Sequence, residues 1–246
     1  MTLIPSAARG AAALAIAAAA GTALAIPPEW ETETGPPLDG LTDAGDDERE
    51  LVSLPFSFPF AGTGYEQIWV YANGVVTLGT EQELDAEPEP DDLSELEQPT
   101  LAAFWSDINT EEGGVVRFNQ FDDRAVITWD AVRSDAADDD ADFSYTFQMQ
   151  LFDDGTIVCG YTSGLLLGDK FLNANLVIGV FDGSFPNVYR FSSDVPFFEP
   201  SNAFYDFWPE ESGFFPLENA NLVFTPGPSG GFDVTDTFEP EPCPAD

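Results

Sequence analysis

Hydrophobic and polar residues alternate along much of the chain with a period of two, which is the spacing of a β-strand rather than of a helix. The clearest stretch runs from Phe143 to Phe152. Phe, Tyr, Phe, Met and Leu occupy its odd-numbered positions, while Ser, Thr and two Gln occupy positions 144–150 between them. Because successive side chains of a strand point to opposite faces, we expect a half-buried antiparallel strand here. Asp153-Asp154-Gly155 follows as a turn, and residues 156–161 return as the partner strand.

Two further hairpins are predicted from turn residues that interrupt apolar runs. Asn73-Gly74, a pair that tolerates positive φ, separates residues 67–72 from residues 75–79, and Asp122-Asp123 separates residues 115–121 from residues 124–132. Further strands are expected at residues 51–58, 101–105, 175–181, 188–191 and 221–224. A short helix is expected only at residues 91–97. About ten short strands predict an all-β fold, an antiparallel β-sandwich.

The ends of the chain differ from its middle in composition. Arg9 precedes the apolar run Ala11–Ala20, and Ala23-Leu24-Ala25 has the small-x-small pattern of a cleavage site, so residues 1–25 are predicted to be a signal peptide. A buried amino-terminal helix is the alternative. Residues 26–49 are expected to form an acidic Pro/Gly-rich lead-in, residues 50–225 the folded domain and residues 226–246 an acidic Pro/Gly-rich tail. No later stretch reaches the ~20 apolar residues of a membrane span, so no transmembrane anchor is expected.

The composition excludes several classes of function. There are 45 Asp and Glu against 7 Lys and Arg, a net charge of −38, so binding to nucleic acid is not expected. The chain has no histidine, which removes Ser-His-Asp catalysis and imidazole-bound zinc. An acid-rich surface also suits high salinity, where a Debye length of about 3 Å at ~1 M salt suppresses self-repulsion. We therefore hypothesise a marine or saline habitat.

The two cysteines leave two interpretations open. An exported chain could pair Cys159 with Cys243 as a disulfide. Alternatively, Cys159 is a small buried hydrophobe within its apolar run.

Five blocks of sequence resemble, in order, the extracellular domain first described in nidogen and its relatives in secreted bacterial proteins. The blocks are Leu54–Gly62 followed by Tyr65, Ile68–Gly79 around the Asn-Gly turn, Leu101–Asn109, Ala125–Val132 and Phe147–Ile157. The resemblance covers roughly residues 51–181. It implies a non-catalytic module of an adhesive, matrix or cell-surface protein, with an extracellular protein or glycan as partner.

We therefore expect a secreted binding or structural module, located outside the cell or on its surface, and no enzyme. A carbohydrate-binding, lectin-like module is the first alternative. A histidine-free glycosidase that uses two carboxylates is a second, but with 45 acids the sequence nominates no catalytic pair.

Two acidic segments are candidates for a cation. Asp107 and Asn109 place oxygen atoms at alternate positions just after a predicted strand, where they could bind calcium or form an Asx turn. Five aspartates crowd residues 135–142, which is either a cation site or a solvated acidic loop. No cofactor is expected apart from this possible calcium.

Aromatic residues give the candidate binding surface. Residues 197–215 are unusually aromatic for a predicted loop, which is either a binding surface or a lid that closes one end of the sandwich. The proposed binding residues within them are Phe204, Tyr205, Phe207 and Trp208. Trp69, Trp105 and Trp129 lie in strand patterns, where core packing competes with sugar stacking as their role.

Overall fold

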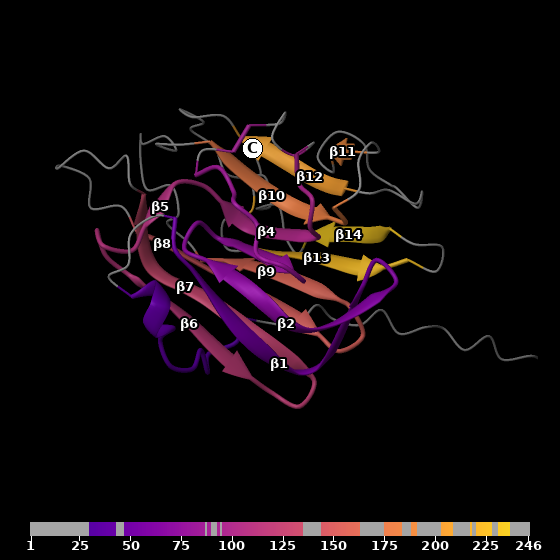
Figure 1. The fold of residues 1–246 in the computed structure, drawn as a ribbon, viewed down its shortest axis with the longest axis horizontal. Helices are drawn as coiled ribbons and strands as arrows, with labels where there is room; N and C mark the ends of the chain where they lie inside the picture. Colours follow the sequence, from indigo (N-terminus) through magenta and orange to yellow (C-terminus); the bar gives the residue numbers. More distant parts are fainter. Residues whose placement is uncertain are drawn as a thin grey trace, which may run out of the picture.

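A computed structural model describes residues 30–42, 47–86, 88–89, 93, 95–134, 144–162, 175–183, 188–190, 203–208, 217, 220–227 and 231–236. The described residues form fourteen strands and one short 3-10 helix, η1 (Asp39–Leu41) (Figure 1). The strands make two seven-stranded sheets that pack face to face. The predicted all-β sandwich is confirmed.

The first sheet, called here the β1 sheet, is antiparallel except for its last pair, in which β11 runs parallel to β12. Its spatial order is β1 (Arg49–Phe60), β2 (Thr63–Tyr71), β3 (Val75–Leu78), β4 (Thr100–Trp105), β10 (Leu176–Phe181), β12 (Ala203–Trp208) and β11 (Val188–Arg190).

The second sheet, called here the β8 sheet, contains the other seven strands. Its spatial order is β14 (Phe232–Asp236), β13 (Asn221–Pro226), β9 (Ile157–Tyr161), β8 (Tyr145–Phe152), β7 (Arg124–Ser134) and β5 (Ile108–Asn109), and β6 (Val115–Gln120) also pairs with β7. The three hairpins predicted from turn residues are confirmed as β2–β3, β6–β7 and β8–β9.

The core lies between the two sheets and is built around stacked aromatic rings. Phe147 of β8 stacks on Trp129 with a centroid separation of 4.9 Å and on Phe104 of the other sheet at 5.0 Å. Tyr145, Met149 and Leu151 complete the buried face of β8. The inward positions of the Phe143–Phe152 pattern that are described, residues 145–151, therefore carry the contact between the layers, as the alternation predicts.

The opposite face of β8 is buried as well, which the expectation of a half-buried strand missed. Gln148 and Gln150 are only 1% and 3% exposed. The backbone at Glu31 covers this part of the face, because Gln148 forms two 3.0 Å hydrogen bonds with it. The ring of Trp30 lies against Gly160 of the neighbouring strand. The Gln148 amide thus satisfies both the N–H and the carbonyl of Glu31, as a neighbouring β-strand would.

The folded domain begins earlier than the predicted boundary at residue 50. Leu38 and Leu41 are buried in the core between the sheets, and the Leu38 N–H donates to the Val116 carbonyl at 2.8 Å. Much of the expected lead-in is therefore part of the sandwich. Its Pro and Gly content indicated a linker. Its burial depends on strands that are distant in the sequence, so no hydrophobic period within the segment indicated that it is folded.

Two strands lie where the sequence predicted a loop or a tail. β12 falls inside the Phe-rich segment, and it carries aromatic residues at successive positions, so no period of two marks it. β14 falls inside the expected tail and pairs with β13, in a register that runs from Leu222 opposite Asp236 to Pro226 opposite Phe232. Phe232 packs on Phe60 at 5.6 Å, which ties this strand to the core.

Several predicted features lie outside the described residues. These are the signal peptide at residues 1–25, the aspartate-rich segment 135–142, Cys243 and part of the expected helix at residues 91–97. Cys159 is buried in β9, as expected for a small hydrophobe.

Candidate functional site

The outer face of the β1 sheet carries a second apolar cluster, separate from the core between the sheets, which we call the outer cluster. It contains six aromatic side chains, including those of Trp69, Tyr71, Trp105 and Phe181. Its remaining members are Val75, Leu84, Leu93, Leu96, Ala102, Val177, Tyr205 and Phe207. Trp69 and Trp105 therefore pack on an outer face, and of the three tryptophans in predicted strands only Trp129 belongs to the core between the sheets.

An acidic segment, Thr80–Pro99, crosses the outer cluster and is called here the strap. At its beginning, Arg49 pairs with both Glu81 and Glu83. Burial alone would lower the pKa of Arg49, but the hydrogen bond and charge of Glu81 and the charge of Glu83 raise it overall. Two carboxylates of the strap therefore share one cation from β1.

Hydrogen bonds from aromatic side chains fix the next residues of the strap. The Tyr71 hydroxyl donates to the Gln82 carbonyl at 2.7 Å and accepts from the Gln82 N–H at 3.1 Å. The Trp105 indole N–H donates to the Asp85 carbonyl at 2.8 Å. Leu93 and Leu96 of the strap are buried in the outer cluster. Tyr71 and Trp105 thus contribute apolar surface to the outer cluster and also hold the strap backbone through hydrogen bonds.

The structure separates the four aromatic residues predicted to bind a partner. In β12, Tyr205 and Phe207 point to the outer cluster, whereas Trp208 packs against the core between the sheets. The backbone of Phe204 pairs with Val180, a residue of the inner face, and the structure does not describe the Phe204 side chain. Because neighbouring strand residues face opposite ways, the four cannot form one binding surface. Tyr205 and Phe207 remain as candidates.

Asp107 and Asn109 are the predicted calcium ligands. Asp107 directly precedes β5, and Asn109 is the last residue of β5. The Asn109 side-chain oxygen accepts the Glu111 N–H at 2.9 Å, which is an Asx turn. Asp107 is 8% exposed. Within the described ranges, no three acidic or cysteine side chains gather closely enough to hold a metal ion. The Asx turn is confirmed for Asn109, and a calcium site at this pair stays a prediction.

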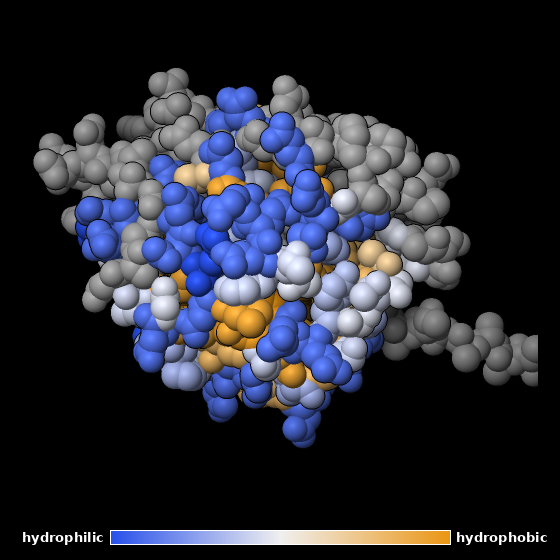
Figure 2. All heavy atoms as spheres, viewed as in Figure 1, coloured by the Kyte–Doolittle hydropathy of each residue, from blue (hydrophilic) through white to orange (hydrophobic). Residues whose placement is uncertain are grey.

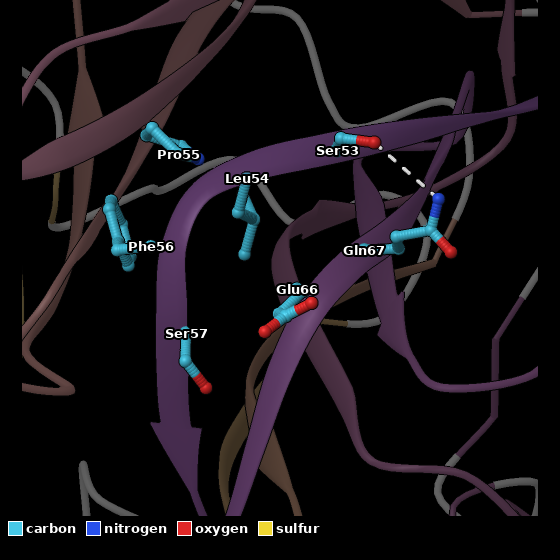
Figure 3. A pocket seen from close by; sticks show the side chains of 7 residues that line it. All are labelled: Ser53, Leu54, Pro55, Phe56, Ser57, Glu66 and Gln67. Atoms are coloured by element: carbon cyan, nitrogen blue, oxygen red, sulfur yellow. Dashed lines mark hydrogen bonds between the residues drawn. The ribbon is translucent and has the colours of Figure 1, made fainter.

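A hollow of about 420 Å³ opens on the β1–β2 hairpin, a feature that the sequence analysis missed. We call it the β1 hollow. It forms at a bulge where residues 54–57 of β1 oppose only Glu66 of β2, since Ser53 pairs with Gln67 and Phe58 with Tyr65. Its lining is Ser53, Leu54, Pro55, Phe56, Ser57, Glu66 and Gln67 (Figure 3). Proline in a strand is confined to edges and bulges, so Pro55 was the available sequence indication.

Leu51 extends the β1 hollow along the outer face of the strand. It is 41% exposed and pairs across the ladder with the half-buried Trp69. Ser53, two residues further along, is paired with Gln67 on the same face. Figure 2 shows a largely hydrophilic surface with a hydrophobic area where Figure 1 draws β1 and β2. We call the combination of Leu51, Trp69 and the β1 hollow the β1–β2 surface.

The buried groups that could act as nucleophiles are poorly suited to that chemistry. Burial raises the pKa of the Cys159 thiol to about 12, although the neighbouring Tyr161 side chain partly opposes the shift. Burial likewise raises the pKa of Tyr161, whose hydroxyl donates to the Ala103 carbonyl at 2.8 Å. A thiol is reactive as the thiolate, so Cys159 stays protonated and inert at neutral pH.

Comparison with known proteins gives one match. A family model described as NIDO related matches residues 28–194, which is more than half of the chain. The match includes the segment Trp30–Leu41, the strap and the β1–β2 surface. No curated protein and no solved structure matches the chain. The part of the chain that the structure describes contains no helix with the length and apolar character needed to cross a membrane.

Proposed function

The chain belongs to the nidogen-related family, and we propose that it is a secreted, non-catalytic binding module of the adhesion type, acting at the cell surface or in the extracellular matrix. The family match confirms the resemblance drawn from the five sequence blocks. A nidogen-related domain is in general an extracellular, non-catalytic module. Adhesion, secretion and the absence of catalysis in this chain belong to the proposal.

The exposure of Leu51 carries the proposal. Among the described residues it is the large hydrophobic side chain that stays substantially in water, at 41% exposure. Elsewhere the strap packs on the outer face of the β1 sheet, and Trp30 and Glu31 cover part of the outer face of the β8 sheet. Single exposed leucines are common on protein surfaces, but Leu51 adjoins the half-buried Trp69 and the β1 hollow, and contiguous apolar surface beside a hollow is typical of a contact with a partner. The β1–β2 surface is therefore the proposed contact region.

The chemistry of the chain supports a binding role rather than a catalytic one. The sequence contains no histidine, and its described cysteine is buried. The hollow contributes one carboxylate, Glu66, whereas glycoside hydrolysis requires a pair of carboxyl groups about 5 to 10 Å apart. Turnover of polysaccharide substrates by the purified chain would contradict this part of the proposal.

The proposal is tested by binding to extracellular material of the source cells. The purified, labelled chain is titrated onto isolated cell-surface and matrix fractions, and the same is done with Leu51→Glu. We expect saturable binding by the wild type and at least tenfold weaker binding by the variant. Because Leu51 is exposed, both proteins should melt at the same temperature. Equal binding by the two proteins would place the contact elsewhere.

A lectin-like role is the second candidate, and the partly buried rings of Tyr205 and Phe207 are the observation that favours it. Both lie on the outer face of β12, where Tyr205 packs against Phe181 with a centroid distance of 6.3 Å. Sugar rings stack on aromatic faces of this kind. A glycan array probed with wild type, Tyr205→Ala and Phe207→Ala separates the candidates, since the lectin role requires glycan binding that both variants lose.

A further inference from the structure

Among the polar side chains of the β1 hollow, Glu66 carries the charge, and its neighbours Ser53, Ser57 and Gln67 are neutral groups that both donate and accept hydrogen bonds. One N–H of the Gln67 side-chain amide donates to the Ser53 hydroxyl at 3.4 Å, so the amide keeps its carbonyl oxygen as an acceptor and its second N–H as a donor. Glu66 contributes a carboxylate that accepts only. Figure 3 shows this carboxylate and the Ser57 hydroxyl at the same end of the hollow. A cationic group with several donors would match the Glu66 carboxylate and the Gln67 carbonyl oxygen.

Glu66 has no cation to neutralise it in the part of the chain that is described. The ion pairs there join Arg49 to the strap, Arg117 to Asp130, and Arg124 to Glu31 and Asp123. The whole chain carries a net charge of −38, so its field attracts cations and repels anions. Anionic ligands are therefore disfavoured at the hollow.

The apolar part of the lining suits the stem of a long cationic side chain. Leu54 is buried at the floor of the hollow, and Pro55 and Phe56 lie beside it (Figure 3). Arginine and lysine bury their methylene stems on such surfaces while the charged head stays hydrated.

We propose that the β1 hollow takes an arginine side chain from a partner polypeptide, with its guanidinium donating to Glu66 and Gln67. Guanidinium has five N–H donors and no acceptor, and its planar shape matches a carboxylate. A sugar hydroxyl is neutral, and so gains less than a cation does from the Glu66 carboxylate. This inference rests on the proposed function, because it names the partner chemistry of the same surface.

The test uses N-acetyl-arginine amide as the probe and N-acetyl-citrulline amide as its uncharged counterpart. Each is titrated into the ¹⁵N-labelled chain at 0.15 M NaCl, and backbone amide shifts are followed by NMR. We expect saturable shifts confined to residues 53–57, 66 and 67 for the arginine probe. The citrulline probe should bind about fivefold more weakly, which corresponds to an exposed ion pair of about 1 kcal/mol.

Two glutamate variants make the measurement specific. Glu66→Gln should weaken arginine binding by about fivefold. Glu112→Gln removes the same charge from the turn after β5 and should leave the affinity unchanged. Repeating the titration at 1 M NaCl should weaken binding without moving the affected residues, since the Debye length falls to about 3 Å.

Several results would overturn the inference. These are equal binding of the two probes, shifts that spread over the acidic surface without saturating, or an effect of Glu66→Gln no larger than that of Glu112→Gln. Binding of a neutral oligosaccharide at residues 53–57 in place of arginine would assign the hollow to glycans. If Leu51→Glu still abolishes surface binding after such a result, the proposed function stands and only the arginine inference is lost.

Discussion

The side-chain oxygen of Asn73 accepts the backbone N–H of Ile108 at 2.8 Å. The same asparagine accepts the Ser106 N–H through its own carbonyl at 3.3 Å. Asn73 is 6% exposed, so both bonds lie away from water. The tip of the β2–β3 hairpin therefore fixes the connection by which the chain passes from β4 in one sheet to β5 in the other.

The glycine that follows Asn73 should be far less replaceable than a glycine with the same backbone conformation elsewhere. Gly74 has φ of 77°, and a Cβ there would lie 2.1 Å from the Phe104 carbonyl oxygen. Gly62 has φ of 80° with nothing within 4 Å of the same position. Gly62→Ala should cost about 1 to 2 kcal/mol through φ alone, and Gly74→Ala clearly more. Urea titration measures both free energies of unfolding, and equal losses would refute the close approach.

Arg49 should control how tightly the strap is held. Arg49→Ala removes the cation shared by Glu81 and Glu83, and because these pairs are partly exposed the loss should be at most about 1 kcal/mol. The larger effect should be faster proteolysis within residues 80–99, with the difference from wild type shrinking at 1 M NaCl. Arg117→Ala removes a single pair with Asp130 and serves as the control. Unchanged strap cleavage in Arg49→Ala would show that Tyr71 and Trp105 suffice.

Gln148 should determine whether the amino-terminal segment stays on the β8 sheet. Gln148→Ala removes both hydrogen bonds to the Glu31 backbone, which should cost about 1 to 3 kcal/mol if the freed groups remain buried. Hydrogen exchange at residues 30–36 should accelerate more than exchange within β8. Gln67→Ala, which removes a 3.4 Å bond on the exposed β1–β2 hairpin, should leave residues 30–36 protected. Exchange that rises uniformly over the chain would instead indicate global destabilisation.

Alkaline pH should destabilise the fold through buried acids that are neutral when folded. Burial raises the pKa of Tyr145 from its ordinary value of 10 to about 12, and that of Cys159 from 9 to about 12. A raised folded pKa leaves its contribution intact below pH 9 and removes it as pH rises toward 12. The combined loss should be a few kcal/mol by order of magnitude.

The Tyr145→Phe variant isolates one of these groups while keeping the ring. Its free energy of unfolding, measured by urea titration between pH 8 and pH 11.5, should fall less steeply above pH 10 than that of the wild type. Identical slopes for the two proteins would show that Tyr145 does not carry a raised pKa.

The extent to which the fold can be predicted depends on local pattern. β8 and the β2–β3 hairpin were predicted because alternation and the Asn-Gly turn act within ten residues. β12 was missed because aromatic residues occupy both of its faces. The burial of Gln148 was missed because the covering residue, Glu31, lies 117 positions away in the chain. Burial by a segment that is distant in the sequence produces no hydrophobic period in the strand that it covers.

The candidate site shows the same limit. Aromatic content alone indicated Tyr205 and Phe207, but grouped them with Trp208, which the alternation of β12 sends to the other side of the sheet. The β1 hollow depends on four residues of β1 opposing one of β2, a register that only the paired strands reveal. Pro55 was consistent with a bulge but did not fix its size.

The most direct test of the central claim is site-specific photo-crosslinking from the β1–β2 surface. A photoreactive side chain is introduced at Leu51 in one variant and at Glu112 in another, and each purified chain is exposed to extracellular material of the source cells. The account predicts a specific crosslinked product from position 51, competed by excess unlabelled wild type, and none from position 112. A competed product from position 112 with none from position 51 would contradict it.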